Sequence, residues 1–148
     1  MSNQFSQHLK QWYPRRDEQK WVLVTIYKID GPSYRSVGAM MLFNDMGEQF
    51  GLLSGGCLEA DIQIKASQVM VSQTSMTVCY DANDEDDMSF LLGIGCGGII
   101  HLLLQPLGSH NNYLQLPAVL EALEKRQSFI LLQKITRDGE SSKATFLA

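Results

Sequence analysis

The chain has 148 residues, of which 45% are hydrophobic and 19% are charged, and its formal net charge is -4 at pH 7. This composition excludes a disordered or fibrous chain and allows one domain with its own hydrophobic core. The acidic balance argues against nucleic-acid binding, and no apolar stretch reaches the roughly 20 residues that cross a bilayer. Because the N-terminus is polar, we expect no secretion signal and a cytoplasmic location.

The first half of the chain predicts one helix followed by strands. We expect the helix over 2–13, where apolar residues share one face until Pro14 interrupts the pattern. The β-branched and aromatic residues of 21–29 predict a buried strand. Two further runs, 40–43 and 49–53, flank an Asn-Asp-Met-Gly turn and predict a hairpin.

The second half predicts two helices and three strands. A helix begins after Leu58, because apolar residues then recur at helical spacing. Cys79 lies in an apolar strand pattern and is expected in the core, and Pro106 is expected to close its strand. The strands are 76–80, 99–104 and 129–136, and the second helix is 116–126. We therefore expect an α/β or α+β fold, a single mixed β-sheet domain with flanking helices.

Two glycine-cysteine segments carry the clearest functional signal, and the first is Ser54-Gly55-Gly56-Cys57-Leu58-Glu59-Ala60-Asp61. A cysteine that follows two glycines and precedes a helix lies among unpaired N–H groups, which stabilise a thiolate. Cys57 is therefore a candidate ligand or nucleophile, and the same N–H groups could hold a phosphate. The alternative is a small buried residue in a tight strand-to-helix turn.

Two carboxylates in the first turn of that helix, Glu59 and Asp61, suit the helix dipole but oppose an anion. Either they face elsewhere or they have a separate task. A carboxylate can accept two parallel hydrogen bonds from an amino-pyrimidinone edge, such as that of a pterin.

The second segment, Gly93-Ile94-Gly95-Cys96-Gly97-Gly98, contains a Gly-x-Gly pattern, but a strand follows it where a dinucleotide fingerprint needs a helix. Rossmann-type binding is therefore not expected. The alternative interpretation of this segment is a glycine-rich turn into the strand 99–104. Three cysteines without a secretion signal indicate thiols, and neither zinc ligands nor a serine-hydrolase triad occur at the required spacings.

A third segment, 30–39, follows the first strand and offers hydroxyl groups and one guanidinium to a phosphate or oxyanion, from Ser33, Tyr34 and Arg35. The alternative is that Arg35 merely pairs with one of the two first-turn carboxylates. The acidic run 81–87 lacks the spacing of a calcium loop and indicates a solvated loop.

Taken in order, these three segments resemble the N-terminal domain of the XdhC/CoxI family, which matures molybdenum hydroxylases such as xanthine dehydrogenase. The resemblance implies a chaperone, more a carrier than an enzyme, that transiently binds molybdenum cofactor and delivers it to a client enzyme. Cys57 and Cys96 match the family's motif cysteines and are the implied metal ligands. The implied cofactor-binding set is Ser33, Tyr34, Arg35, Gly55, Gly56, Cys57, Glu59, Asp61, Gly95, Cys96 and Gly97.

The resemblance also implies partners and a domain organisation. A molybdenum hydroxylase client, a cysteine desulfurase and a cofactor nucleotidyltransferase are implied partners, and we expect a homo-oligomer. We expect one domain over 1–148, without the Rossmann-like C-terminal domain common in the family. The sequence departs from the family at Pro32, commonly serine, and at 36–37, commonly Arg-Pro. Two alternatives stay open: a thiol enzyme transferring persulfide or redox equivalents through Cys57 and Cys96, or a non-catalytic oligomeric regulatory module.

Overall fold

The structure is a computed structural model that describes residues 3–33, 35–54, 56, 58–81, 84, 98–135 and 144–148. In chain order its elements are α1 (Asn3–Trp12), the 3-10 helix η1 (Tyr13–Arg15), β1 (Trp21–Asp30), β2 (Met40–Asn44), β3 (Gln49–Phe50), α2 (Glu59–Ser72), β4 (Met76–Asp81), β5 (Ile99–Leu107), the 3-10 helix η2 (Ser109–Gln115), α4 (Leu116–Glu124), β6 (Ile130–Leu132) and β7 (Thr145–Leu147).

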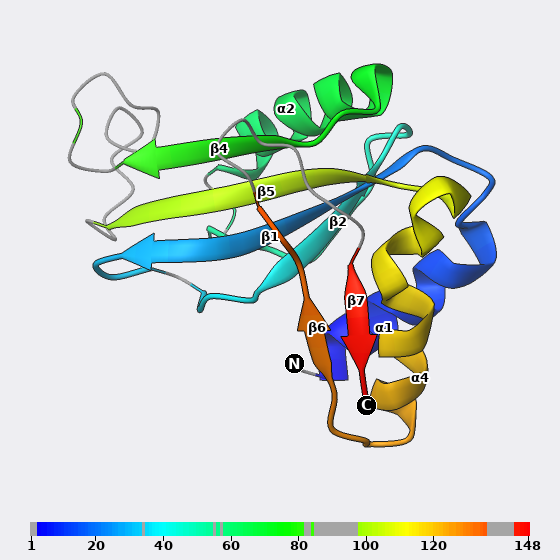
Figure 1. Ribbon diagram of the computed structural model, residues 1–148. Coiled ribbons are helices and arrows are strands. Elements are labelled where there is room, and N and C mark those ends of the chain that lie inside the picture. Colours follow the sequence, from blue (N-terminus) through cyan, green and yellow to red (C-terminus); the bar gives the residue numbers. More distant parts are fainter. Residues whose placement is uncertain are drawn as a thin grey trace.

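A five-stranded antiparallel sheet in the order β3-β2-β1-β5-β4 forms the centre of the fold. Helix α2 runs along one face of this sheet, and α1 and α4 pack together near one end of the opposite face (Figure 1). Strands β6 and β7 form a separate two-stranded sheet beside α1 and α4. The expected α+β class, with one principal sheet and flanking helices, is confirmed.

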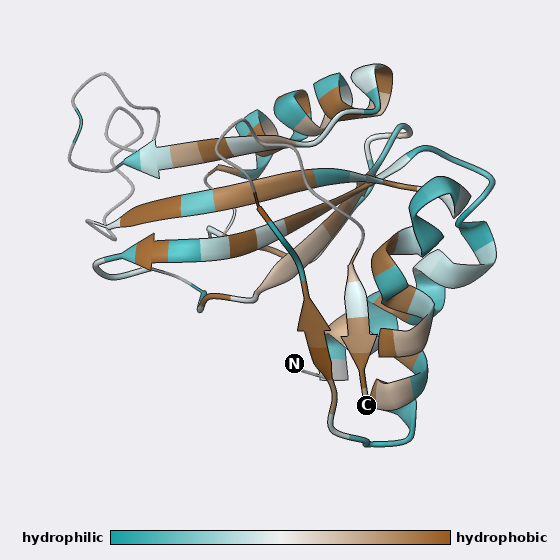
Figure 2. Ribbon diagram, in the orientation of Figure 1, coloured by the Kyte–Doolittle hydropathy of each residue, from teal (hydrophilic) through white to brown (hydrophobic). Residues whose placement is uncertain are grey.

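Strand β1 is buried on both faces, which explains its almost continuous run of apolar residues. Val22, Val24 and Ile26 belong to the core under α2, whereas Trp21 and Leu23 belong to the core under α1 and α4. Successive side chains of a strand point to opposite faces, so a central strand between two helical layers needs apolar residues at every position. Figure 2 shows brown, apolar ribbon along the central strands and on α4.

Strand β5 continues through Pro106 to Leu107, so the expectation that Pro106 closes the strand is wrong. Pro106 pairs with Val22 of β1, whereas the last pair on the other side joins Met76 of β4 to Leu104. At Pro106 the strand therefore no longer has β4 as a neighbour. A proline tolerates such a position, because its missing N–H is not required by a second strand.

The expectation that Cys79 lies in the core is also wrong, because Cys79 is exposed. Its neighbour Tyr80 is only 3% exposed and packs in the core under α2. Since side chains alternate along β4, Cys79 points to the other face of the sheet, at its edge. The apolar pattern of 76–80 was a correct signal for a strand but did not reveal which face was covered.

Two other strands are shorter than expected. Strand β3 comprises only Gln49–Phe50, and β6 only Ile130–Leu132. Both helices after the first, α2 and α4, begin within one residue of the expected positions. Within the described ranges, no helix is both long and apolar enough to cross a membrane.

Candidate functional site

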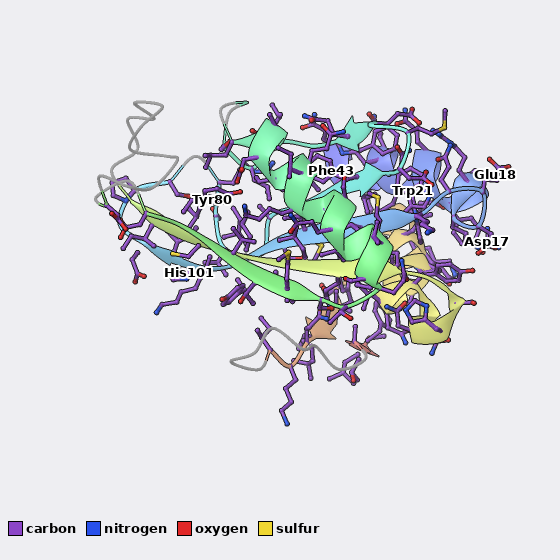
Figure 3. The ribbon with its side chains drawn as sticks, turned by 90° about the horizontal axis from the view of Figure 1, so that it is seen from above. Asp17, Glu18, Trp21, Phe43, Tyr80 and His101 are labelled. Carbon is purple, nitrogen blue, oxygen red and sulfur yellow. The ribbon has the colours of Figure 1, made fainter. Side chains whose placement is uncertain are left out.

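The three segments singled out in the sequence border one end of the five-stranded sheet. At this end β1 finishes at Asp30, β5 begins at Ile99 and β4 finishes at Asp81, and both aspartates pair with Ile99 in the register. The first turn of α2 lies over the same end, as its contact with Tyr80 of β4 shows. Tyr80 and His101 mark this end in Figure 3, while Trp21 and Phe43 lie toward the other.

Gly98 packs directly against the segment that follows β1. A Cβ atom added to Gly98 would lie 2.0 Å from the carbonyl oxygen of Pro32 and 3.0 Å from that of Asp30. No side chain fits in this space, so the position requires glycine for close backbone approach. The contact brings the end of the segment 93–98 onto the segment 30–39.

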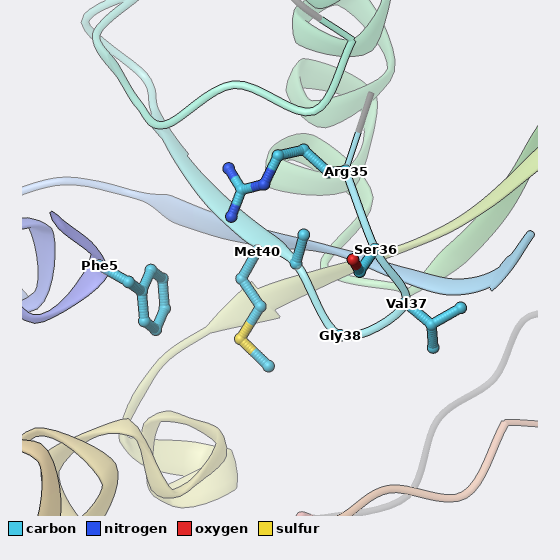
Figure 4. A pocket seen from close by; sticks show the side chains of 7 residues that line it. Phe5, Arg35, Ser36, Val37, Gly38 and Met40 are labelled. Atoms are coloured by element: carbon cyan, nitrogen blue, oxygen red, sulfur yellow. The ribbon is translucent and has the colours of Figure 1, made fainter. Parts of the chain in front are cut away.

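Arg35 joins the segment 30–39 to the segment before α2. Its Nη1 donates a hydrogen bond to the carbonyl oxygen of Leu52 over 3.0 Å, and its own carbonyl oxygen accepts one from the hydroxyl of Ser33. Arg35 also lines a pocket of about 330 Å³ together with Phe5 and Met40 (Figure 4). The guanidinium therefore stands at the rim of a half-apolar pocket, partly exposed to solvent.

Ser54 and Glu59 form a buried hydrogen-bond network at the entry to α2. Oε1 of Glu59 accepts the N–H groups of Leu53 and Ser54 over 2.8 and 2.9 Å, and Oε2 accepts the Ser54 hydroxyl over 2.6 Å. The N–H of Leu58 donates to Ser54 Oγ over 2.8 Å. Ser54 and Glu59 are 8% and 3% exposed, so the network is shielded from water.

The ionisation of Glu59 reflects two opposing effects. Burial raises the pKa of this carboxyl group, but the hydrogen bonds from the Ser54 hydroxyl and from the N–H groups of Ser54 and Leu53 lower it. The hydrogen bonds prevail, so the pKa of Glu59 lies below its usual value. Glu59 is therefore a buried, charged carboxylate whose oxygens already hold the backbone that leads into α2.

Asp61 ties the first turn of α2 to the sheet. The hydroxyl of Tyr80 donates to Oδ2 of Asp61, and Nζ of Lys65 lies 3.4 Å from the same oxygen. The side chain of Asp61 keeps 19% of its surface exposed, unlike that of Glu59. Because both carboxylates have these other partners and Arg35 contacts Leu52, the alternative in which Arg35 merely pairs with one of them does not describe the structure.

Gly56 is the described glycine of the Gly-Gly pair. Its φ of +104° is unfavourable for residues with a side chain, yet nothing lies within 4 Å of an added Cβ. The backbone conformation, rather than lack of space, therefore calls for glycine at this position, and the surrounding space is open.

The structure describes five of the predicted site residues and places them around this end of the sheet: Ser33, Arg35, Gly56, Glu59 and Asp61. Six others lie outside the described residues: Tyr34, Gly55, Cys57, Gly95, Cys96 and Gly97. The prediction that Cys57 and Cys96 bind one metal therefore stays a prediction. Within the described residues, no group of three or more metal-binding side chains gathers.

Three contributors to this arrangement were not predicted from the sequence. Ser54 was quoted as part of a segment but was given no role, although a serine four residues before the N–H it accepts is a capping signal. Tyr80 and the Leu52 carbonyl had no signal in the sequence, because their roles depend on how β4 and the residues after β3 pack.

This geometry defines an α+β domain in which three glycine-containing segments border one end of an antiparallel sheet. Residues 15–81 match the model of the XdhC and CoxI family. The chain belongs to this family, as relatives and a solved structure also indicate.

Two curated relatives are similar to the chain. It is 45% identical over 86 residues to a probable xanthine dehydrogenase subunit of Bacillus subtilis (strain 168), which covers 58% of the chain and 26% of that protein. It is 35% identical over 129 residues to the "Molybdenum cofactor insertion chaperone PaoD" of Escherichia coli (strain K12), covering 80% of the chain and 39% of that protein.

A crystal structure described as a xanthine dehydrogenase from Bacillus halodurans has the same fold. The TM-score is 0.83 at 39% sequence identity, and the match covers 99% of this chain and 42% of that one. The chain thus spans between a quarter and somewhat over two fifths of the length of these relatives.

Proposed function

We propose that this chain is part of a maturation factor that binds molybdenum cofactor and delivers it to a molybdenum hydroxylase. Family membership and the similarity to a protein named as a molybdenum cofactor insertion chaperone support a maturation role. The observation that carries the proposal is the convergence of the three segments, through the Gly98 contact with Pro32 and the Arg35 contact with Leu52.

Each part of the cargo has a matching group at this end of the sheet. Arg35 holds a guanidinium at the rim of a pocket, and a guanidinium suits the terminal phosphate of the cofactor. The amide groups around Gly55 and Gly56 add donors for the same phosphate. Cys57 and Cys96 supply the soft sulfur ligands that a molybdenum dithiolene would accept.

The two first-turn carboxylates divide their tasks in this proposal. Glu59 accepts three hydrogen bonds from its own chain and is buried, so it positions the segment that carries Cys57. Asp61 stays partly exposed, and an ionised carboxylate offers about four acceptor sites, of which the Tyr80 hydroxyl uses one. Asp61 is therefore the carboxylate that we assign to the pterin edge.

Reconstitution tests this function. The purified chain is incubated without oxygen with cofactor released from a molybdenum enzyme, passed over a gel-filtration column, and analysed for molybdenum and pterin. We expect both to elute with the wild-type chain and to be lost from the Cys57→Ser, Cys96→Ser double variant. The matched control is Cys79→Ser, which removes the third and exposed cysteine and should leave the retained amounts unchanged.

Equal retention by wild type and the double variant would remove the thiols from the proposal, and no retention by wild type would overturn it. Arg35→Gln separates the phosphate contact, because it should weaken retention of the intact cofactor but not of a dephosphorylated pterin. Delivery is then measured as the activity gained by a cofactor-free molybdenum hydroxylase that receives the loaded chain.

The remaining expectations belong to the same proposal. The client is a molybdenum hydroxylase, and a cysteine desulfurase and a cofactor nucleotidyltransferase act before or after the chain in delivery. We also propose a cytoplasmic, homo-oligomeric protein, which sedimentation at several concentrations tests.

A further inference from the structure

A second pocket, of about 700 Å³, lies on the face of the sheet opposite α2. On one side it is lined by Thr25 and Tyr27, which alternate along β1 with the residues that pack under α2. On the other side it is lined by Phe129, Leu131 and Gln133, which alternate along and beside β6 and therefore share one face. The pocket is thus built between the two sheets, away from the first turn of α2.

The chemistry of this lining is apolar and uncharged. Two aromatic rings, those of Tyr27 and Phe129, contribute to it, and none of the described side chains that line it carries a charge. Binding an ion without a counter-charge in such surroundings is unfavourable, since the ion loses its water. The lining therefore selects a neutral ligand, and the volume lies within the usual range of small-molecule pockets.

Two buried polar atoms in this lining lack hydrogen-bond partners. They are Oγ1 of Thr25 and Nε2 of Gln133, both shielded from solvent. A buried polar group without a partner costs about 1–3 kcal/mol of stability, so native proteins keep few of them. Two in one pocket, one hydroxyl and one amide, are what a binding site leaves for a ligand to satisfy.

We propose that this pocket binds an uncharged bicyclic heterocycle with a ring carbonyl. Its rings pack against Tyr27 and Phe129, and its polar edge bonds to the Thr25 hydroxyl and the Gln133 amide. This site is distinct from the end of the sheet assigned to the cofactor, but it shares Val37 and Met40 with the pocket lined by Arg35. A ligand bound here contacts the residues that directly follow Arg35.

The test uses three matched probes on the protein without molybdenum cofactor, so its result does not depend on the proposed function. The probes are quinazolin-4-one, quinazoline, which lacks the carbonyl, and 4-oxoquinazoline-2-carboxylate, which adds a charge. Titration calorimetry should give measurable binding of quinazolin-4-one and weaker binding of both others. No binding of quinazolin-4-one, or equal binding of all three, would overturn the proposal.

Two near-isosteric variants, Thr25→Val and Gln133→Met, separate a ligand contact from a structural role. Each should weaken quinazolin-4-one binding about fivefold, as expected for one lost hydrogen bond, without weakening quinazoline binding. Each should also raise the melting temperature of the unliganded protein by about 2–4 °C, because an unsatisfied buried group is removed. Unchanged quinazolin-4-one affinity, or a lowered melting temperature, would show that these groups serve the fold instead.

Discussion

The hydroxyl of Ser54 donates to Oε2 of Glu59 over 2.6 Å, while the same hydroxyl oxygen accepts the N–H of Leu58 over 2.8 Å. One side chain thus connects a carboxylate in the first turn of α2 with the backbone just before that turn. Because Glu59 also accepts the N–H groups of Leu53 and Ser54, the residues on both sides of the Gly-Gly-Cys sequence are held in place. The network fixes the two ends of that segment.

Removing the Glu59 carboxylate should destabilise the protein strongly. Glu59→Ala leaves the buried N–H groups of Leu53 and Ser54 without their acceptor, which should cost about 3 kcal/mol of unfolding free energy. Glu59→Gln keeps an acceptor oxygen and should cost about 1 kcal/mol. Urea denaturation measures both values. A loss below about 1 kcal/mol for Glu59→Ala would mean that water replaces the carboxylate, and the network is not structural.

The same carboxylate makes stability depend on acid pH. The folded-state pKa of Glu59 lies below its usual value, so its contribution is complete above about pH 4.5 and disappears as the pH falls through the lower, folded value. The stability difference between wild type and Glu59→Gln should be constant near neutral pH and shrink below pH 4.5. Denaturation between pH 3 and 7 measures it, with Glu121→Gln as an exposed control that shows little difference at any pH. A difference that grows on acidification would contradict this assignment.

Gly98→Ala should be more harmful than Gly56→Ala. At Gly98 the new methyl group meets the Pro32 carbonyl at 2.0 Å, so backbone must move, at about 2–3 kcal/mol. At Gly56 the space is open, and only the positive φ is unfavourable, at about 1–2 kcal/mol. Thermal unfolding ranks the two variants, and amide chemical shifts of Asp30 to Ser33 should move only in Gly98→Ala. The reverse ranking would show that the two backbone segments can separate without cost.

The Tyr80 hydroxyl should contribute through Asp61 alone. Tyr80→Phe keeps the buried ring and removes only the donor to Asp61, and should cost about 1 kcal/mol. In a double-mutant cycle with Asp61→Asn, the two changes should be less than additive, because each removes the same interaction. Strict additivity of the unfolding free energies would show that the contact contributes nothing in solution.

Much of the fold could be predicted from local patterns. The run of 21–29 predicted β1 correctly because a central strand buried on both faces must be apolar throughout. The environment of an edge strand could not be predicted in the same way. Cys79 and Tyr80 are adjacent, and only the position of α2 decides that Tyr80 is buried and Cys79 is not.

The candidate site was predictable in part, for a different reason. Glycine-rich segments predicted where backbones approach closely, and Gly98 does so against Pro32. The role of Glu59 was not predictable, because its carboxylate could face a ligand or its own chain with the same sequence. Long-range packing decides that question, and it left Asp61 as the more accessible carboxylate.

The outward position of Cys79 has a practical consequence for chemical labelling of this protein. A thiol reagent added to the native chain should reach this sulfur whether or not a cargo shields the other two cysteines. Cys79 therefore offers an internal reference rate: labelling of Cys57 and Cys96 can be compared with it in one sample, by mass spectrometry of the digested peptides. A bound cargo then registers as slower labelling at two positions against an unchanged third.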